Sequence, residues 1–130
     1  RASAHADVTM SVCTGAFGIV GARVATGRTI TTHPAVLDDL REFAARIEED
    51  VTVINPDPTA PEPNARVVED GNLITCGGVT SGIDEALYLV QKFWPSKLDG
   101  VREFVDYPYT FKSLNVQAWR AVNSAPRAAR

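Results

Sequence analysis

The sequence of 130 residues is long enough for one ordinary domain, or for a large part of a bigger one. Hydrophobic residues make up 45% of the chain and its formal net charge is −3, which excludes a strongly basic nucleic-acid-binding protein. No apolar run is long enough to cross a membrane, no signal-peptide pattern is present, and two cysteines are too few for a disulfide scaffold. So few cysteines fit a reducing compartment, and we expect the protein in the cytoplasm.

Residues 8–12 predict an apolar strand of the kind that lies in the middle of a sheet, with a neighbour on either side. The chain begins at Arg1, and its only methionine is Met10. We therefore expect residues 1–130 to be the C-terminal portion of a single domain, with the first strands on a separate chain. A short expressed fragment is the alternative.

The stretch VTMSVCTGAFGIVGA, residues 8–22, predicts a strand that runs directly into a helix. Cys13 stands at the corner, where a tight backbone would push its side chain out of the sheet. The free N–H groups of the first helical turn would favour a thiolate there. Because cysteine is also among the most buried residue types, a core position for Cys13 is the alternative.

The segment after this corner predicts a helix at residues 14–25 and a β-branched strand at residues 28–32. Gly18 and Gly21 are expected to let the helix lie close to the strands beneath it, and Gly27 to act as a left-handed stop. The apolar stripe of this helix comprises Phe17, Val20 and Val24.

Pro34 opens the segment with the clearest helical periodicity, in which one face is apolar and the other is charged. Its predicted buried face comprises Val36, Leu37, Leu40, Phe43, Ala44 and Ile47. A strand is expected at residues 51–54. Residues 55–64, NPDPTAPEPN, contain four prolines and predict an exposed loop.

Asp70-Gly71 is a hairpin-turn signal between predicted strands at residues 66–69 and 72–76. The next helix is expected to begin at Thr80 or Ser81 and to end near residue 93. Its Ser81 and Asp84 have the spacing of a capping box. Its apolar stripe comprises Ile83, Ala86, Leu87, Val90 and Phe93.

The last part of the chain predicts a short helix around residues 101–105. Residues 111–119 are expected to cover an edge of the sheet, and residues 120–130 to form a loose tail. The alternation of strands and helices predicts an α/β fold with a parallel sheet covered on both faces. Working residues of such sheets gather at the carboxyl ends of the strands, where Cys13, His33 and Gly77-Gly78 all fall.

Four segments resemble the ThiJ/PfpI superfamily, the class I glutamine-amidotransferase-like proteins: SVCTGAF at 11–17, GRTITTHP at 27–34, RVVEDGNLITCGG at 66–78 and VTSGIDEALYLV at 79–90. The first and last are most similar to the isocyanide hydratase branch and to ligand-sensing domains of transcription regulators. TTHP also resembles the branch of the Parkinsonism-associated deglycase. The resemblance implies a flavodoxin-like three-layer sandwich with a mostly parallel sheet, of which this chain supplies the C-terminal part.

The resemblance also implies a site. Cys13 would be the nucleophile, His33 would lie near it, and backbone N–H groups around Thr14, Gly15 and Gly78 would stabilise charge on the substrate. Peptidase-type members carry a histidine directly after the cysteine, so Thr14 disfavours proteolysis. The family's acidic residue comes from first strands that this chain lacks, and no metal or organic cofactor is implied.

These features favour a cysteine-dependent hydratase or hydrolase-like enzyme, acting on an isocyanide or a reactive aldehyde. Its expected partners are the small substrate, a separate chain with the N-terminal half, and a second copy of the complete unit, but neither nucleic acid nor membrane. A redox sensor is one alternative, in which Cys76 serves as the redox partner of Cys13. A non-catalytic small-molecule-binding domain and an acquired role of the two-chain form are the others.

Overall fold

The structure is a computed structural model that describes residues 2–107 and 116–118. The strands within these residues are β1 (Thr9–Val12), β2 (Arg28–Ile30), β3 (Val51–Val53), β4 (Val67–Asp70), β5 (Leu73–Cys76) and β6 (Val116–Ala118). The α-helices are α1 (Ala16–Gly21), α2 (Leu37–Arg46), α3 (Val79–Phe93) and α4 (Leu98–Phe104). Short 3-10 helices are η1 (Ala2–Ala4), η2 (Cys13–Gly15), η3 (Pro34–Val36) and η4 (Pro95–Lys97).

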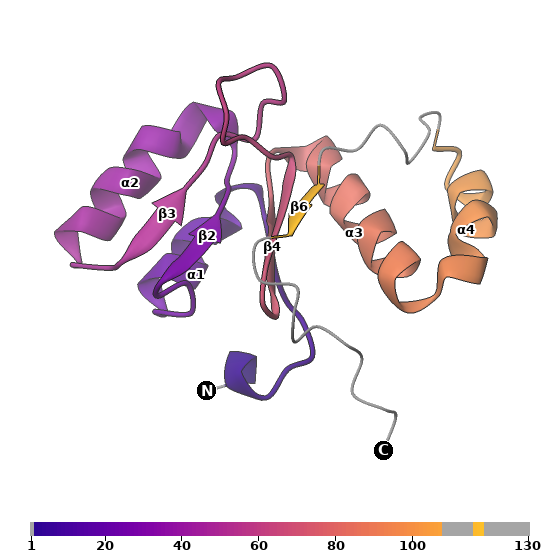
Figure 1. The fold of residues 1–130 in the computed structure, drawn as a ribbon, viewed down its shortest axis with the longest axis horizontal. Helices are drawn as coiled ribbons and strands as arrows, with labels where there is room; N and C mark the ends of the chain where they lie inside the picture. The colour runs from indigo at the N-terminus through magenta and orange to yellow at the C-terminus, as the bar shows by residue number, and fades with distance from the viewer. Residues whose placement is uncertain (1, 108–115, 119–130) are drawn as a thin grey trace.

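The strands form two sheets. One has the order β1-β5-β4-β6, in which β4 and β5 are antiparallel and the other pairs are parallel. The other consists of β2 and β3, which are parallel. Helices α1 and α2 lie on one side of the strands, and α3 and α4 lie on the other (Figure 1). The predicted α/β arrangement with helices on both sides is therefore confirmed.

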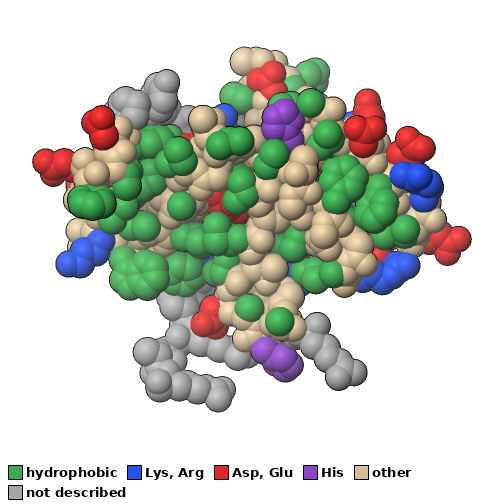
Figure 2. Space-filling view, turned by 180° about the vertical axis from the view of Figure 1, so that it is seen from behind, with side chains coloured by type: hydrophobic (Ala, Val, Ile, Leu, Met, Phe, Trp, Pro, Cys, Tyr) green, Lys and Arg blue, Asp and Glu red, His purple; other side chains and the backbone are tan. Residues whose placement is uncertain are grey.

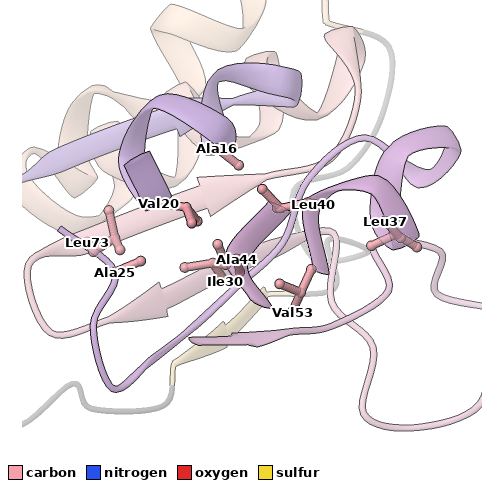
Figure 3. Packing of buried hydrophobic residues seen from close by; sticks show 9 residues of the cluster. All are labelled: Ala16, Val20, Ala25, Ile30, Leu37, Leu40, Ala44, Val53 and Leu73. Carbon is pink, nitrogen blue, oxygen red and sulfur yellow. The ribbon is translucent and has the colours of Figure 1, made fainter. Parts of the chain in front are cut away.

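The largest apolar core lies between α1, α2 and the strands (Figure 3). It contains Ala16, Val20, Ala25, Ile30, Leu37, Leu40, Ala44, Val53 and Leu73. Helix α2 contributes three of these residues at the spacing expected for one helical face, so its predicted stripe is confirmed. Burial of this apolar surface is the main favourable term in holding the helices against the strands.

The β4–β5 hairpin also forms as predicted, with Gly71 at a φ of 66° in the turn. Side chains of the hairpin connect the two sheets. The Oδ2 atom of Asp70 accepts a 2.7 Å hydrogen bond from the backbone N–H of Thr29, and the Oγ1 atom of Thr75 accepts one of 2.9 Å from Thr31. Because Asp70 and Thr75 are buried, these bonds satisfy polar groups that water cannot reach.

The helix after Cys13 is shorter than predicted. Its first turn is the 3-10 helix η2, and α1 ends at Gly21, because Arg23 has a left-handed φ of 55° and the Arg23 guanidinium binds Glu49. Gly27, with a φ of 67°, lies in the turn before β2.

The expected close approach of Gly18 and Gly21 to the strands is wrong. No atom of the described residues lies within 4 Å of a Cβ placed on Gly18, and Gly21 faces the Phe43 ring instead.

Helix α3 departs from the prediction in both its N-terminal cap and its buried face. Gly78 is its N-cap and no side chain caps it, so the predicted capping box is wrong. The face that packs on β4 and β5 carries Ser81, Asp84, Glu85 and Leu87, whereas Ile83 of the predicted stripe is 46% exposed. Two contacts explain why α3 buries a different face from the predicted one. Asp84 is paired with Arg66, and Gly82 lies so close to β1 that an added Cβ would be 2.9 Å from Val12.

Strand β1 lies at the end of its sheet among the described residues, not in the middle as expected. Its Met10 and Val12 are 39% and 42% exposed, and Val79 and Ile83 are exposed on the turn of α3 that packs against Val12. The face seen from behind carries many hydrophobic side chains (Figure 2). The strand therefore presents an open, apolar edge, which is unusual for a sheet in a finished domain.

The proline-rich loop is mostly exposed, but Pro56 and Asn64 are buried, and a bridge between Asn55 and Asn64 closes its base. Strand β6 pairs with the outer edge of β4, which confirms the predicted edge cover for residues 116–118. The predicted tail at 120–130 lies outside the described residues. None of the helices in the described part of the chain is long and apolar enough to span a membrane.

Candidate active site

Cys13 occupies the predicted corner between β1 and η2. Its φ is 56°, a left-handed value that costs a residue with a side chain about 1–3 kcal/mol, so surrounding contacts must hold it. One such contact is a 2.9 Å hydrogen bond from the Oγ1 atom of Thr32 to the Cys13 carbonyl oxygen, and Thr32 is fully buried. The Cys13 side chain remains partly exposed, in contrast to a core cysteine.

His33 follows Thr32 and caps η3. Its Nδ1 atom accepts a 3.1 Å hydrogen bond from the backbone N–H of Ala35. A neutral imidazole with Nδ1 as acceptor carries its proton on Nε2, so Nε2 is a hydrogen-bond donor. The ring lies against Gly78, where an added Cβ would be 3.1 Å from the His33 Cδ2 atom. The structure thus brings His33 and Gly78 together, as their position at the strand ends predicted.

A cavity of about 490 Å³ opens at this edge of the sheet. It is lined by His33, Pro34, Pro56, Asp57, Pro58, Arg66, Gly78, Val79, Thr80 and Ser81. Cys13 is not among the lining residues. Its carbonyl oxygen accepts a hydrogen bond from Thr32, the residue before the cavity-lining His33, and the cavity is large enough for a small organic molecule.

Arg66 is the cavity residue that the sequence analysis missed. Its Nε atom binds the buried Asp84 carboxylate, and its Nη2 atom donates a 2.8 Å hydrogen bond to Thr80. These contacts fix a positive charge beside the first turn of α3. An arginine at the start of a predicted strand carries no local signal for this role, because Asp84 is 18 residues away in the chain.

The predicted charge-stabilising N–H groups lie in two places. Thr14 and Gly15 are exposed in η2, directly after Cys13, and Gly78 is the N-cap of α3 beside His33. Helix starts leave backbone N–H groups without intrahelical acceptors, so both places can offer donors to an anionic oxygen. Their assignment to the substrate remains a prediction.

Cys76 is fully buried at the end of β5, beside Val12 in the parallel register. Burial raises the pKa of its thiol strongly, and the nearby Glu85 carboxylate raises it further. Cys76 is therefore a protonated thiol in the core, whereas Cys13 is partly exposed. Its role as a redox partner stays a prediction.

Glu85 is the second group that the sequence analysis missed. It lies on the buried face of α3, has no exposed surface, and neither carboxylate oxygen has a hydrogen-bond partner among the described residues. Burial raises its pKa from about 4.5 to about 7, and the neighbouring Cys76 thiol opposes that shift. The helical periodicity of α3 predicted that the face with Ile83 and Ala86 is buried, so Glu85 was not among the residues expected to be buried.

Residues 1–92 match the sequence model of the DJ-1/PfpI family. The chain is 39% identical over 90 residues to an isonitrile hydratase from Pseudomonas putida, an alignment that covers 69% of this chain and 33% of that protein. It therefore spans about a third of the length of this curated relative.

Two solved structures share the fold. A ThiJ/PfpI family protein from Pseudomonas syringae matches with a TM-score of 0.63 and 28% identity, over 83% of this chain and 39% of that one. DJ-1beta from Drosophila melanogaster matches with a TM-score of 0.58 and 21% identity, over 78% and 47% of the two chains. The flavodoxin-like fold that the sequence segments implied is therefore confirmed. With its matched segment covering residues 1–92, the chain belongs to the DJ-1/PfpI family.

Proposed function

We propose that this chain carries the nucleophile of a cysteine-dependent hydratase for a small electrophile, either an isocyanide or a reactive aldehyde. The observation that carries the proposal is the left-handed Cys13 corner between β1 and η2, with the Cys13 carbonyl held by Thr32. Strain of this kind persists only where surrounding structure enforces it, and it is common at catalytic nucleophiles. Similarity to an isonitrile hydratase supports the same activity.

The proposed reaction begins when the Cys13 thiolate adds to the electrophilic carbon. With an isocyanide, the carbon gains a bond to sulfur and a proton, which gives a thioimidate. Water then adds to that carbon, and the carbon–sulfur bond breaks to return the thiolate and release an N-substituted formamide. With an aldehyde the first adduct is a hemithioacetal.

His33 is proposed as a donor in this reaction. Its Nε2–H can hydrogen-bond a substrate heteroatom in the cavity, because Nδ1 already accepts the Ala35 N–H. The backbone N–H groups at Thr14, Gly15 and Gly78 would stabilise developing negative charge. Positive charge on Arg66 at the cavity wall would favour an electron-rich substrate group.

We further propose that a polypeptide with the N-terminal half of the domain pairs with β1. The open edge of β1 and the exposed Met10, Val12, Val79 and Ile83 support this, since another strand and its side chains would cover them. That half would supply the acidic residue near Cys13, and the completed unit would form a dimer. Intact mass of the species that co-purify with the chain tests the arrangement.

The activity is tested by turnover of a small alkyl isocyanide and of glyoxal. Cys13→Ala should abolish turnover of whichever compound is the substrate, whereas Cys76→Ala, which removes the buried thiol, should retain measurable turnover. Circular dichroism of both variants controls for folding. Full activity of Cys13→Ala on both compounds would contradict the mechanism.

A further inference from the structure

Two thiols and a buried carboxyl meet beneath the Cys13 corner. Val12, the residue before Cys13, is the register partner of Cys76 on the neighbouring strand. On ideal neighbouring strands, about 4.8 Å apart with a rise of about 3.3 Å per residue, Cα atoms one residue out of register are about 6 Å apart, and Cys13 directly follows the strand residue paired with Cys76. That separation is within the range that a disulfide spans. The backbone N–H of Cys13 also acts on the Cys76 thiol.

Glu85 completes the group. It is fully buried on α3, and no N–H or O–H group among the described residues donates to its two carboxylate oxygens. Its ionisable neighbour is the Cys76 thiol, whose contact with the carboxylate lowers the Glu85 pKa and so opposes the effect of burial. A buried carboxyl that no N–H or O–H group or cation compensates is unfavourable for the fold, so its presence points to a task other than stability.

The two thiols differ in access. Cys13 is partly exposed, whereas Cys76 is fully buried at the end of β5. A peroxide arriving from solvent therefore meets Cys13 first. Cys76 is closed to solvent, so a peroxide does not reach it directly.

We propose that Cys76 is the resolving thiol for oxidised Cys13, and that Glu85 is the base that removes its proton. The proposal goes beyond the hydratase activity and needs only a reactive thiol at Cys13. It makes this corner a site of reversible oxidation.

A hydroperoxide transfers one oxygen atom to the Cys13 thiol, which becomes a sulfenic acid, and the peroxide is reduced to water or an alcohol. The Cys76 sulfur then attacks the Cys13 sulfur, and the sulfur–oxygen bond breaks. Glu85 takes the Cys76 proton and returns it to the departing hydroxide, which leaves as water. Two thiols have then been oxidised to one disulfide.

The buried setting explains why a base is needed. Burial and the Glu85 carboxylate keep the pKa of Cys76 high, so its free thiolate is scarce and direct oxidation of Cys76 is slow. Proton removal in the same step as sulfur–sulfur bond formation avoids that free thiolate. Closure of the disulfide also protects Cys13 from irreversible oxidation to a sulfinic acid, because a disulfide can be reduced by other thiols.

The test treats the purified protein with one equivalent of hydrogen peroxide, blocks free thiols with N-ethylmaleimide, and uses intact mass with peptide mapping. The wild type should lose two hydrogens and give a linked Cys13–Cys76 peptide. Cys76→Ser should instead accumulate sulfenic and then sulfinic acid at Cys13. Glu85→Gln should slow disulfide closure about a hundredfold, the size of a typical general-base effect. Glu103→Gln, an exposed position on α4, is the matched control.

Two results would overturn the proposal: sulfinic Cys13 in the wild type without a linked peptide, or closure in Glu85→Gln as fast as in the wild type. If Glu85→Gln does not fold by circular dichroism, the comparison of wild type with Cys76→Ser still decides the resolving step. Isocyanide turnover by untreated wild-type protein, measured in parallel, separates this outcome from the proposed activity. Turnover of the untreated protein with no Cys13–Cys76 disulfide after peroxide rejects the redox role alone, and a disulfide without turnover rejects the hydratase activity alone.

Discussion

Glu85 makes a quantitative prediction about how stability depends on pH. Its carboxyl is fully buried, and burial raises its pKa from about 4.5 to about 7. Between these two values the folded protein binds a proton that the unfolded chain does not. The free energy of unfolding therefore falls as pH rises from about 4.5 to about 7, and stays lower above that.

The size of the effect follows from the same two values. A pKa that is higher in the folded state by this amount corresponds to a loss of about 3 kcal/mol well above pH 7. Between pH 5 and pH 8 the Glu85 contribution should fall by about 2.5 kcal/mol. Glu85→Gln removes the titration and keeps the side-chain volume, so the variant should gain stability relative to the wild type by this amount over the same range.

Urea unfolding of both proteins at several values between pH 5 and pH 8 measures the difference. The pH dependence of the difference is the test, since any constant effect of the amide is the same at each pH. Glu103→Gln, at an exposed position, should run parallel to the wild type. Parallel curves for Glu85→Gln and wild type would refute the reasoning and would place the Glu85 carboxyl in contact with solvent.

Three further changes test the packing and the corner. Gly82→Ala should destabilise the protein by about 1–3 kcal/mol in urea unfolding, because its Cβ would lie 2.9 Å from Val12 and α3 must move away from β1. Leu40→Ala should cost about 2–5 kcal/mol, since Leu40 has no exposed surface in the core under α2; a smaller loss would mean that the core collapses around the gap. Cys13→Gly should be more stable than Cys13→Ala by about 1 kcal/mol, because only glycine adopts a φ of 56° without strain; equal stability would show that the corner relaxes.

Local signals were sufficient for much of the fold. The Asp70-Gly71 turn, the periodic face of α2 and the strand that runs into Cys13 each depend on residues close together in the chain. Hairpin chemistry and helical periodicity act over a few residues, so a sequence can show them directly. The same is true of the Cys13 corner, because a strand followed at once by a helical turn leaves little room for a relaxed backbone.

The orientation of α3 could not be read in the same way. Its sequence has an apolar stripe, yet the buried face includes Asp84, which pairs with Arg66 from the other side of the hairpin. Such a contact depends on where distant segments meet. The apolar Val79 and Ile83 remain exposed, on the turn of α3 that contacts Val12 of β1, so the stripe did not predict which face of α3 is buried.

The buried glutamates differ in whether a cation compensates them. Glu49 accepts hydrogen bonds from Arg23 and Thr26, and Glu69 accepts them from Tyr88 and Lys92. Each of these carboxylates is compensated by a cation, so each is explained by the fold itself. Glu85 is equally buried but has no such partner among the described residues.

Two unfavourable features thus occur in groups that act on the Cys76 thiol: the strained backbone of Cys13 and the uncompensated carboxyl of Glu85. A fold selected for stability alone would favour a relaxed residue at position 13 and an apolar side chain at position 85. Groups with perturbed pKa values and strained backbones are concentrated at functional sites. Our proposal that Glu85 serves as a base for Cys76 gives this buried acid a role, which the proposed hydratase chemistry at Cys13 alone does not.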